Sequence, residues 1–341
     1  ENNTLADLKM NKPLRVALLG LGTVGSGTFN VLNTNASEIE RRVGFPIQIK
    51  VIADLNTEKA RELAGPGVEV LGDAFEAVKR DDIDVVVELI GGYTIAKQLV
   101  LAAINAGKHV VTANKALLAV HGDEIFAAAE AKNVMVAFEA AVAGGIPVIK
   151  AIKEGLAANK IEYVAGIING TCNFILSEMR DKGLPFADVL AQAQAFGYAE
   201  ADPTFDIEGV DAAHKISLLS SLAFGVPVQF EKAYIEGITK LTKEDIQFAE
   251  QLGYRVKLLG IAKRTDQGIE LRVHPTLIPG KRLIANVEGV MNAVLVKANA
   301  VGPTLYYGAG AGSLPTASAV VADLIEIARA SQAPLASRVP V

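Results

Sequence analysis

The sequence predicts an α/β protein with a parallel-sheet domain followed by a second α+β domain that has a mixed sheet. From Leu14 onwards, short apolar runs alternate with segments of helical periodicity, a pattern typical of βαβ units. Near Gly144 this alternation gives way to longer loops and mixed strands. The length of 341 residues also exceeds the usual size of a single domain.

The first domain is expected to contain five strands joined by helices. Turn formers at 105–108 and 131–133 end two of these helices just before a strand. The apolar runs predict strands at 14–19, 47–54, 83–90, 108–113 and 134–140.

The second domain is expected to begin at a glycine turn followed by Pro147 at a first helical position. A final helix, with Pro315 near its start, is predicted at 313–330. We expect the first domain to comprise 1–140, completed by the C-terminal segment 302–341, and the second to comprise 141–301. Further strands are predicted at 161–168, 269–278 and 290–301.

Composition and charge disfavour several classes of protein. Thirty-three basic residues face 38 acidic ones, and no stripe of Lys and Arg offers the clustered cations that a nucleic-acid partner requires. There is no run of about 18 uncharged apolar residues, and the opening segment lacks the apolar core of a signal peptide. We therefore expect a cytoplasmic protein without a membrane partner.

Zinc chemistry is not expected either. The single Cys172 excludes an internal disulfide and any multi-cysteine zinc site, and the four histidines show no ligand spacing. We interpret Cys172 as a small buried core residue, since buried thiols usually act as small hydrophobes.

The segment GLGTVG, residues 20–25, satisfies the G-x-G-x-x-G pattern directly after a strand and at the start of a helix. Gly20 permits a tight turn, Gly22 lets the backbone approach a pyrophosphate, and Gly25 allows close packing of helix on strand. The helix N-terminus at Thr23 and Val24 offers N–H groups to phosphates. The first domain is thus predicted to be a Rossmann-type NAD(P)-binding domain.

Two further residues are candidates for the cofactor site. Asp54 ends the second strand, where a carboxylate can bind the adenosine ribose hydroxyls and favours NAD, although Lys59 and Arg61 could offset its repulsion of a 2'-phosphate. The choice between NAD and NADP stays open, and Asp54 could instead be a helix cap. Lys115 follows the fourth strand, where its cation would project into the cofactor crevice unless it is an ordinary surface lysine.

An acidic segment at 197–225 carries the groups best suited to catalysis. If a helix runs from about Ile207 to Phe224, Asp211 and Lys215 share one face with flanking leucines, so the pair should be at least partly buried. An exposed surface ion pair is the alternative.

Hydride transfer from an alcohol carbon requires a side chain that takes or gives the proton of the oxygen. Without zinc ligands or a convincing histidine, Lys215 is the best candidate. Glu200 and Asp206 could bind a substrate ammonium group, which would exclude purely anionic substrates.

Several motifs together resemble those of the homoserine dehydrogenase family, in order and over nearly the whole chain. The resemblance implies reversible oxidation of L-homoserine to L-aspartate 4-semialdehyde, a branch step towards threonine and methionine, in a homodimer formed through the second domain. The motifs are GLGTVG, TANK, EAAVAGGIP, NGTCNFIL, GYAEADPTFDIEGVDAAHK and GPTLYYGAGAGSLPTASAVV.

By this resemblance, Glu200, Asp206 and Asp211 would contact substrate and Lys215 would be the proton donor or acceptor. Lys115 would lie between cofactor and substrate, assisting binding or proton transfer. Gly197 would approach the cofactor from the second domain.

The resemblance also implies a sodium ion in the EAAVAGGI segment, with a purely structural glycine turn as the alternative. The ion would be bound by the main-chain carbonyls of Glu139, Val142, Gly144 and Ile146. Many relatives also carry an arginine suited to a 2'-phosphate where this chain has Ala53.

Two other functions remain open. The chain could be a dehydrogenase of another small amino or hydroxy acid, or a non-catalytic NAD(P)-binding redox sensor. The Asp211 and Lys215 pair weighs against the sensor, which needs no acid/base group.

Overall fold

The computed structural model describes residues 12–332, which form two compact units. The first comprises 12–141 and 312–332, and the second comprises 142–311. The predicted first domain also includes 1–11 and 333–341, which lie outside the described residues. Among the described residues, no helix is long and apolar enough to cross a membrane.

The first unit contains a six-stranded sheet in the order β3-β2-β1-β4-β5-β6, with every neighbouring pair parallel. The prediction missed one edge strand, because Glu69–Leu71 is only three residues long. The strands are β1 Leu14–Leu19, β2 Ile47–Ala53, β3 Glu69–Leu71, β4 Val85–Glu88, β5 His109–Thr112 and β6 Val136–Ala137.

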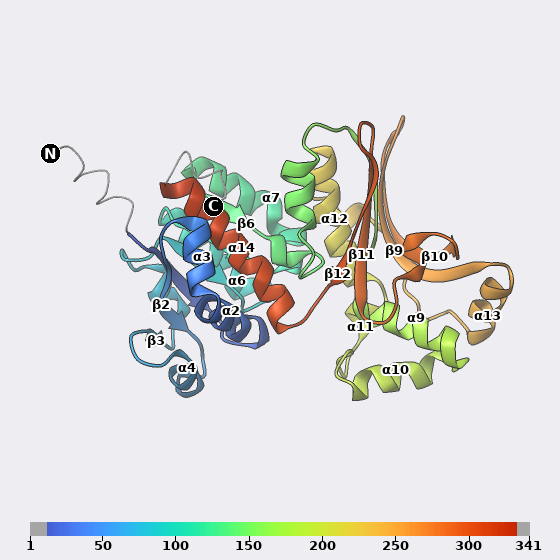
Figure 1. The fold of residues 1–341 in the computed structure, drawn as a ribbon, viewed down its shortest axis with the longest axis horizontal. Helices are drawn as coiled ribbons and strands as arrows, with labels where there is room; N and C mark the ends of the chain where they lie inside the picture. The colour runs from blue at the N-terminus through green and yellow to red at the C-terminus, as the bar shows by residue number, and fades with distance from the viewer. Residues whose placement is uncertain (1–11, 333–341) are drawn as a thin grey trace. The chain divides into compact units, whose positions relative to one another are not determined.

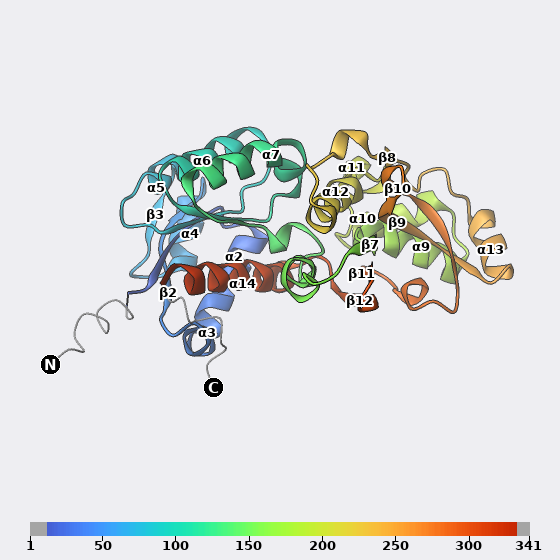
Figure 2. The ribbon, with the colours of Figure 1, turned by 90° about the horizontal axis from the view of Figure 1, so that it is seen from above.

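Helices cover both faces of this sheet. One layer contains α2, α3 and α14, with α14 lying along α2, and the other contains α6 and α7 (Figures 1 and 2). The helices are α2 Thr23–Thr34, α3 Ala36–Val43, α4 Thr57–Ala64, α5 Ala74–Val78, α6 Thr94–Asn105, α7 Lys115–Lys132 and α14 Ser313–Gln332.

The central strands β1 and β4 are buried because helices cover both of their faces. Leu18, Leu19, Val86 and Val87 have no exposed surface. The last strand is shorter than predicted: the main-chain N–H of Glu139 donates to Asp323 Oδ2 at 2.9 Å, and Glu139–Ala141 forms a 3-10 turn (η1) in place of further strand.

The second unit contains a mixed sheet in the order β12-β11-β7-β9-β10-β8. All pairs are antiparallel except β10 with β8. The strands are β7 Ile161–Ile167, β8 Tyr234–Ile235, β9 Tyr254–Thr265, β10 Gly268–Pro279, β11 Met291–Ala298 and β12 Gly302–Ala309.

The strand β12 corrects the predicted domain boundary. The sequence predicts residues 302–309 in the first domain, but they pair with β11 over eight residues and so belong to the second sheet. The chain returns to the first unit only at Gly312.

Helix α12 packs closely on this sheet at a glycine position of β9. A Cβ at Gly260 of β9 would lie 3.1 Å from Ile216, so glycine permits the close approach of the helix. The helices and short turns of the second unit are α8 Val148–Lys150, η2 Ala151–Gly155, α9 Gly170–Lys182, α10 Phe186–Ala195, α11 Thr204–Ile207, α12 Val210–Phe224, η3 Phe230–Lys232, α13 Lys243–Gln251 and η4 Leu283–Asn286.

The predicted helix over 207–224 is interrupted near its start. Gly209 adopts a left-handed conformation, with φ of 85°, which separates α11 from α12. The helix that carries Asp211 and Lys215 therefore begins at Val210.

Candidate active site

The glycine turn after β1 has the geometry that its motif requires. Gly20 has φ of 91°, and a Cβ there would lie 2.9 Å from the carbonyl oxygen of Leu89. A Cβ on Gly25 would lie 2.1 Å from the carbonyl oxygen of Gly20, so only glycine lets α2 begin this close to the turn. At Gly22, by contrast, a Cβ would meet no atom within 4 Å beyond its chain neighbours, which leaves space for a ligand.

The N-terminus of α2 opens beside this space. Gly22 is the N-cap and provides no side-chain cap, so the first N–H groups of the helix, at Thr23 and Val24, are not capped by it. Gly22 and Thr23 are exposed. These features fit a pyrophosphate, because a helix N-terminus combines free N–H donors with a favourable dipole.

Asp54 fixes the other side of the turn. Its carboxylate accepts hydrogen bonds from the main-chain N–H groups of Leu21 at 2.7 Å and Asn56 at 2.8 Å. The helix cap that follows is provided by Asn56, whose side chain accepts from Lys59 N. Asp54 thus joins β2 to the glycine turn, and the cap considered as its alternative role belongs to Asn56.

A pocket of about 540 Å³ lies beside these residues at the carboxyl ends of β1, β2 and β4. The side chains of Leu55, Phe75, Ile90 and Ile95 give it apolar walls suited to a purine ring. Gly20, Gly22 and Asp54 all line it. The residues present therefore fit a dinucleotide.

Lys115 is the first residue of α7, close behind the end of β5, and is half-buried. Asn114 caps this helix by accepting from the N–H of Leu117 at 3.0 Å. The main chain at Lys115 is thereby fixed at the carboxyl edge of the sheet.

Asp211 and Lys215 form the ion pair that their spacing predicts. Lys215 Nζ lies 2.8 Å from Asp211 Oδ2, and only 12% and 9% of the two side chains are exposed. Lys215 also donates to the carbonyl oxygen of Ile168 at 2.6 Å. The prediction that the pair is at least partly buried is confirmed.

Asn169, which the sequence analysis missed as a site residue, links the carboxylates of this cluster. Its amide nitrogen donates to Asp206 Oδ1 at 2.7 Å and to Asp211 Oδ2 at 2.9 Å. Its amide oxygen caps α9 through the N–H of Cys172 at 2.8 Å. The available signal was an asparagine directly between a strand and a helix, the ordinary pattern of an N-cap.

Cys172 contacts the main chain of the same cluster. It is fully buried, and its thiol donates to the main-chain carbonyl of Asp206 at 3.1 Å. Burial, together with the nearby Asp206 and Asp211, raises the pKa of the thiol well above its usual value. Cys172 is therefore a buried structural residue, as interpreted from the sequence.

Gly197 and Glu200 lie on the exposed loop between α10 and α11. Gly197 has φ of 77°, and the main-chain carbonyl of Glu200 accepts from Gln194 Nε2 at 3.0 Å. This hydrogen bond fixes the loop backbone and leaves the Glu200 carboxylate exposed to solvent.

The turn at 142–146 has an unusual backbone. Ala143 and Gly144 are both left-handed, with φ of 56° and 42°, and Ala143 is one of two non-glycine residues with positive φ in the described chain. A Cβ on Gly144 would lie 2.4 Å from the carbonyl oxygen of Gly310. Such strain is typical of sites where main-chain orientation matters.

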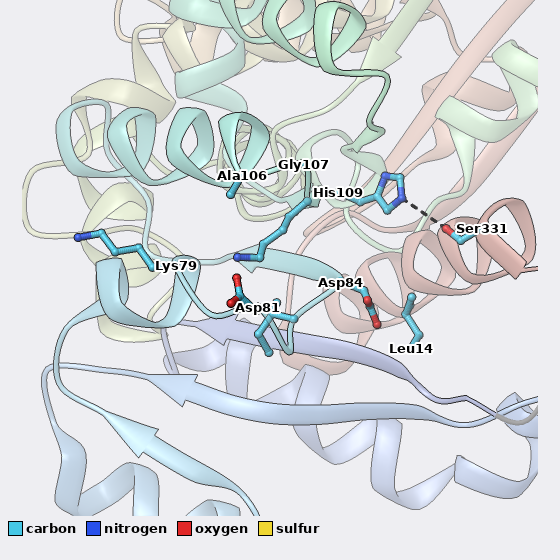
Figure 3. A pocket seen from close by; sticks show the side chains of 10 residues that line it. Leu14, Lys79, Asp81, Asp84, Ala106, Gly107, His109 and Ser331 are labelled. Carbon is cyan, nitrogen blue, oxygen red and sulfur yellow. Dashed lines mark hydrogen bonds between the residues drawn. The ribbon is translucent and has the colours of Figure 1, made fainter. Parts of the chain in front are cut away.

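No cluster of three or more His, Cys, Asp or Glu side chains within residues 12–332 could hold a metal ion. His214 is buried against the rings of Phe205 and Phe230. His109 lines a separate pocket of about 390 Å³ at the amino ends of β1, β4 and β5, where its ring is 3.4 Å from Ser331 Oγ (Figure 3). That pocket lies at the sheet edge opposite the glycine turn.

One unit has a parallel sheet of the type that binds dinucleotides, and the other has a buried cluster of a lysine and carboxylates. Together they define a nicotinamide-dependent oxidoreductase that acts on an alcohol. The family model for homoserine dehydrogenase matches residues 147–325, and that for the homoserine dehydrogenase NAD-binding domain matches residues 20–139. The chain belongs to the homoserine dehydrogenase family.

Known relatives agree with this assignment. Homoserine dehydrogenase of Neisseria gonorrhoeae is 65% identical over 96% of this chain and 75% of its own length, and that of Pseudomonas aeruginosa is 64% identical over the same shares. A solved homoserine dehydrogenase from Thiobacillus denitrificans is 66% identical, with a TM-score of 0.93 over 96% of this chain and 76% of that one. A hyperthermophilic archaeal homoserine dehydrogenase in complex with NADPH is 25% identical, with a TM-score of 0.79 over 93% of this chain and 98% of that one.

Proposed function

We propose that Lys215, held by Asp211, transfers the proton in the reversible oxidation of L-homoserine to L-aspartate 4-semialdehyde. The observation that carries this proposal is the 2.8 Å contact between two side chains that are about nine-tenths buried. Buried charges of this kind cluster at functional sites more often than elsewhere.

The hydrogen bonds of Lys215 leave it equipped for this task. A lysine ammonium has three N–H donors, and two of them point to Asp211 and the Ile168 carbonyl. The third is available to a substrate oxygen. In the oxidation the neutral amine takes the hydroxyl proton, and in the reduction the ammonium returns it to the carbonyl oxygen. A bound nicotinamide would supply the hydride acceptor for the oxidation and the hydride donor for the reduction.

Asp206 and Glu200 are proposed to bind the substrate ammonium group. Asp206 is oriented by Asn169 at 2.7 Å, and Glu200 keeps an exposed carboxylate on a loop anchored at its main chain. An ammonium group pairs well with carboxylates, whereas a substrate with only negative charge would be repelled.

The cofactor is proposed to be NAD or NADP, bound by Gly20, Gly22, Thr23, Val24 and Gly25. Asp54 would accept from the adenosine ribose, since each of its oxygens has a lone pair beyond its single main-chain bond. Lys115 and Gly197 are proposed to contact the nicotinamide half.

The experiment that tests this function is a spectrophotometric assay with homoserine and each cofactor separately, alongside other small amino and hydroxy acids. We expect NAD or NADP to be reduced with homoserine and not with the other acids. Preferred turnover of another acid would indicate a dehydrogenase of that acid. Tight nucleotide binding without any turnover would indicate a redox sensor.

A sodium ion is proposed to bind the carbonyl groups of Glu139, Val142, Gly144 and Ile146. The two consecutive left-handed residues in this segment are the structural support, because they turn the main chain sharply. Replacing sodium chloride by a salt of a bulky organic cation should lower both thermal stability and turnover. Equal values in the two salts would leave only a structural turn.

A homodimer is proposed in which a second copy of the chain covers a groove of the second unit that is lined by β7, β10, η4, β11 and β12. This apolar groove has a volume of about 690 Å³, and Leu277 and Leu283, which line it, are 56% and 75% exposed. Leu305→Glu would put a charge in the groove and should convert dimer to monomer in sedimentation. A wild-type monomer would contradict the proposal.

Together with the proposed reaction, we propose that it is a branch step towards threonine and methionine and that the protein is cytoplasmic.

A further inference from the structure

Glu88, the last residue of β4, is a fully buried carboxyl group that the proposed proton transfer does not use. Its Oε2 accepts from Thr112 Oγ at 2.8 Å. Its Oε1 accepts from the N–H of Gly91 and from Asn114 Nδ2, both at 3.2 Å. Burial raises the pKa of this carboxyl group. Burying a carboxyl group costs free energy, so its presence at this position needs a structural or functional reason.

The partners of Glu88 lie at the carboxyl edge of the sheet, beside the glycine turn. The N–H of Leu89 donates to the carbonyl oxygen of Leu19 at 2.9 Å, and the carbonyl oxygen of Leu89 faces Gly20. Gly91 and Gly92 follow with φ of 86° and 77°, and a Cβ on either would meet no atom within 4 Å beyond its chain neighbours. This edge is where ligands bind in open parallel sheets.

Asn114 carries the network towards Lys115. Its amide nitrogen donates to Glu88 and to the carbonyl oxygen of Gly92 at 2.8 Å, while its amide oxygen caps α7. Its main-chain N–H donates to Thr112 Oγ at 3.0 Å. One carboxyl group therefore fixes both the glycine pair and the first turn of the helix that begins with Lys115.

We propose that Glu88 is a positioning residue for the nicotinamide half of the cofactor site, acting through Asn114 on Lys115 and through Gly91 on the glycine pair. This inference rests on the proposed role of Lys115. The adenosine half, built by Gly22, Thr23 and Asp54, shares none of these hydrogen bonds. Ile90, which lines the purine pocket, lies next to Gly91, so loss of Glu88 should disturb the nicotinamide end of the cofactor more than the adenosine end.

The three partners of Glu88 are donors, which suits a carboxylate. Glu88→Gln keeps most of this geometry: its amide oxygen can accept from Gly91 and Asn114, and its NH2 can donate to Thr112 Oγ, which has a second lone pair. Glu88→Ala removes all three bonds and leaves the donors unpaired. Glutamine should rescue what alanine loses if the hydrogen bonds are what matters.

The test compares binding of the reduced cofactor that the wild type prefers with binding of its ADP-ribose fragment, 2'-phosphorylated if that cofactor is NADPH. Calorimetry should show that Glu88→Ala weakens the dinucleotide at least tenfold and the fragment at most about threefold. Turnover with homoserine should fall about 100-fold, since a misplacement of about 1 Å can cost that much. Glu88→Gln should stay within about threefold of the wild type in each measurement.

Asp84→Asn is the matched control, because Asp84 lies just before the amino end of the same strand and bonds Arg15. It should leave both affinities unchanged. Equal weakening of dinucleotide and fragment in Glu88→Ala, or unchanged turnover, would overturn the proposal. If Glu88→Ala does not fold, Thr112→Val decides: weaker dinucleotide binding with normal fragment binding supports the inference, and normal binding of both refutes it. Unchanged turnover in Lys115→Ala would instead refute the proposed role of Lys115.

Discussion

Replacing Asn169 by serine removes the two amide donors that hold the carboxylates of the site together. Serine retains the N-cap of α9, so the helix start is preserved and the change is confined to Asp206 and Asp211. A hydrogen bond to a charged group contributes about 1.5–3 kcal/mol, so two such bonds amount to about 3–6 kcal/mol. Asp206 is half-exposed and regains water, whereas Asp211 is only 6% exposed and does not. We therefore expect a loss near the lower bound, about 3 kcal/mol in the free energy of unfolding.

The same change should reduce turnover about 100-fold, because the released Asp211 no longer holds Lys215 in one place. Urea unfolding gives the stability, and steady-state kinetics with homoserine give the turnover. Asn159→Ser is the control: Asn159 accepts from the N–H groups of Ala300 and Val301 near the start of β7, at the opposite end from Asn169. It should lower stability slightly and leave the turnover of folded enzyme unchanged. If Asn169→Ser turns over like Asn159→Ser, the amide does not organise the site.

Two other predictions follow from the glycine turn and from a buried lysine. Gly22→Ala should weaken dinucleotide binding without lowering the melting temperature, whereas Gly25→Ala should lower both, since its methyl group would lie 2.1 Å from a carbonyl oxygen; calorimetry and thermal unfolding separate them, and normal binding by Gly22→Ala would contradict the assigned site. Burial lowers the pKa of Lys257 to about 8, so above that pH the unfolded chain holds a proton that the folded chain lacks, and stability should rise up to the usual lysine value of about 10.5, by up to about 3 kcal/mol. Urea titrations at about pH 7.5 and about pH 10 should show this contribution in the wild type and in Lys263→Met, at an exposed position further along the same strand, but not in Lys257→Met. An identical slope in all three proteins would rule it out.

The parts of the fold with strong local signals could be predicted from the sequence. The run LRVALL is β1 at the predicted residues, because a strand buried on both faces is almost continuously apolar, and its one charged residue, Arg15, is only partly buried. The i, i+4 spacing placed Asp211 and Lys215 on one helix face, and leucines beside them indicated burial. Both results depend only on local periodicity.

The misses have a common cause in distant contacts. Residues 302–309 contain glycine, proline and two tyrosines, and nothing in that composition says that they pair with β11. Glu88 lies within an apolar run, and the sequence indicates only that it belongs to a strand. Its proposed positioning role depends on hydrogen-bond partners that are three to 26 residues away in the sequence. Asn169 reads as an ordinary helix cap until Asp206 and Asp211 come within hydrogen-bond distance. A sequence shows which residues can make such bonds but not which of them meet.

The most direct measurement is a comparison of wild type and Lys215→Ala in two assays, turnover of homoserine and equilibrium binding of the nicotinamide cofactor. If the ammonium beside Asp211 moves the substrate proton, alanine should lower turnover by a factor of about 100 to 10,000, as expected for loss of a general acid or base, and leave cofactor affinity nearly unchanged. Turnover at the wild-type rate, or a parallel loss of cofactor affinity, would contradict it.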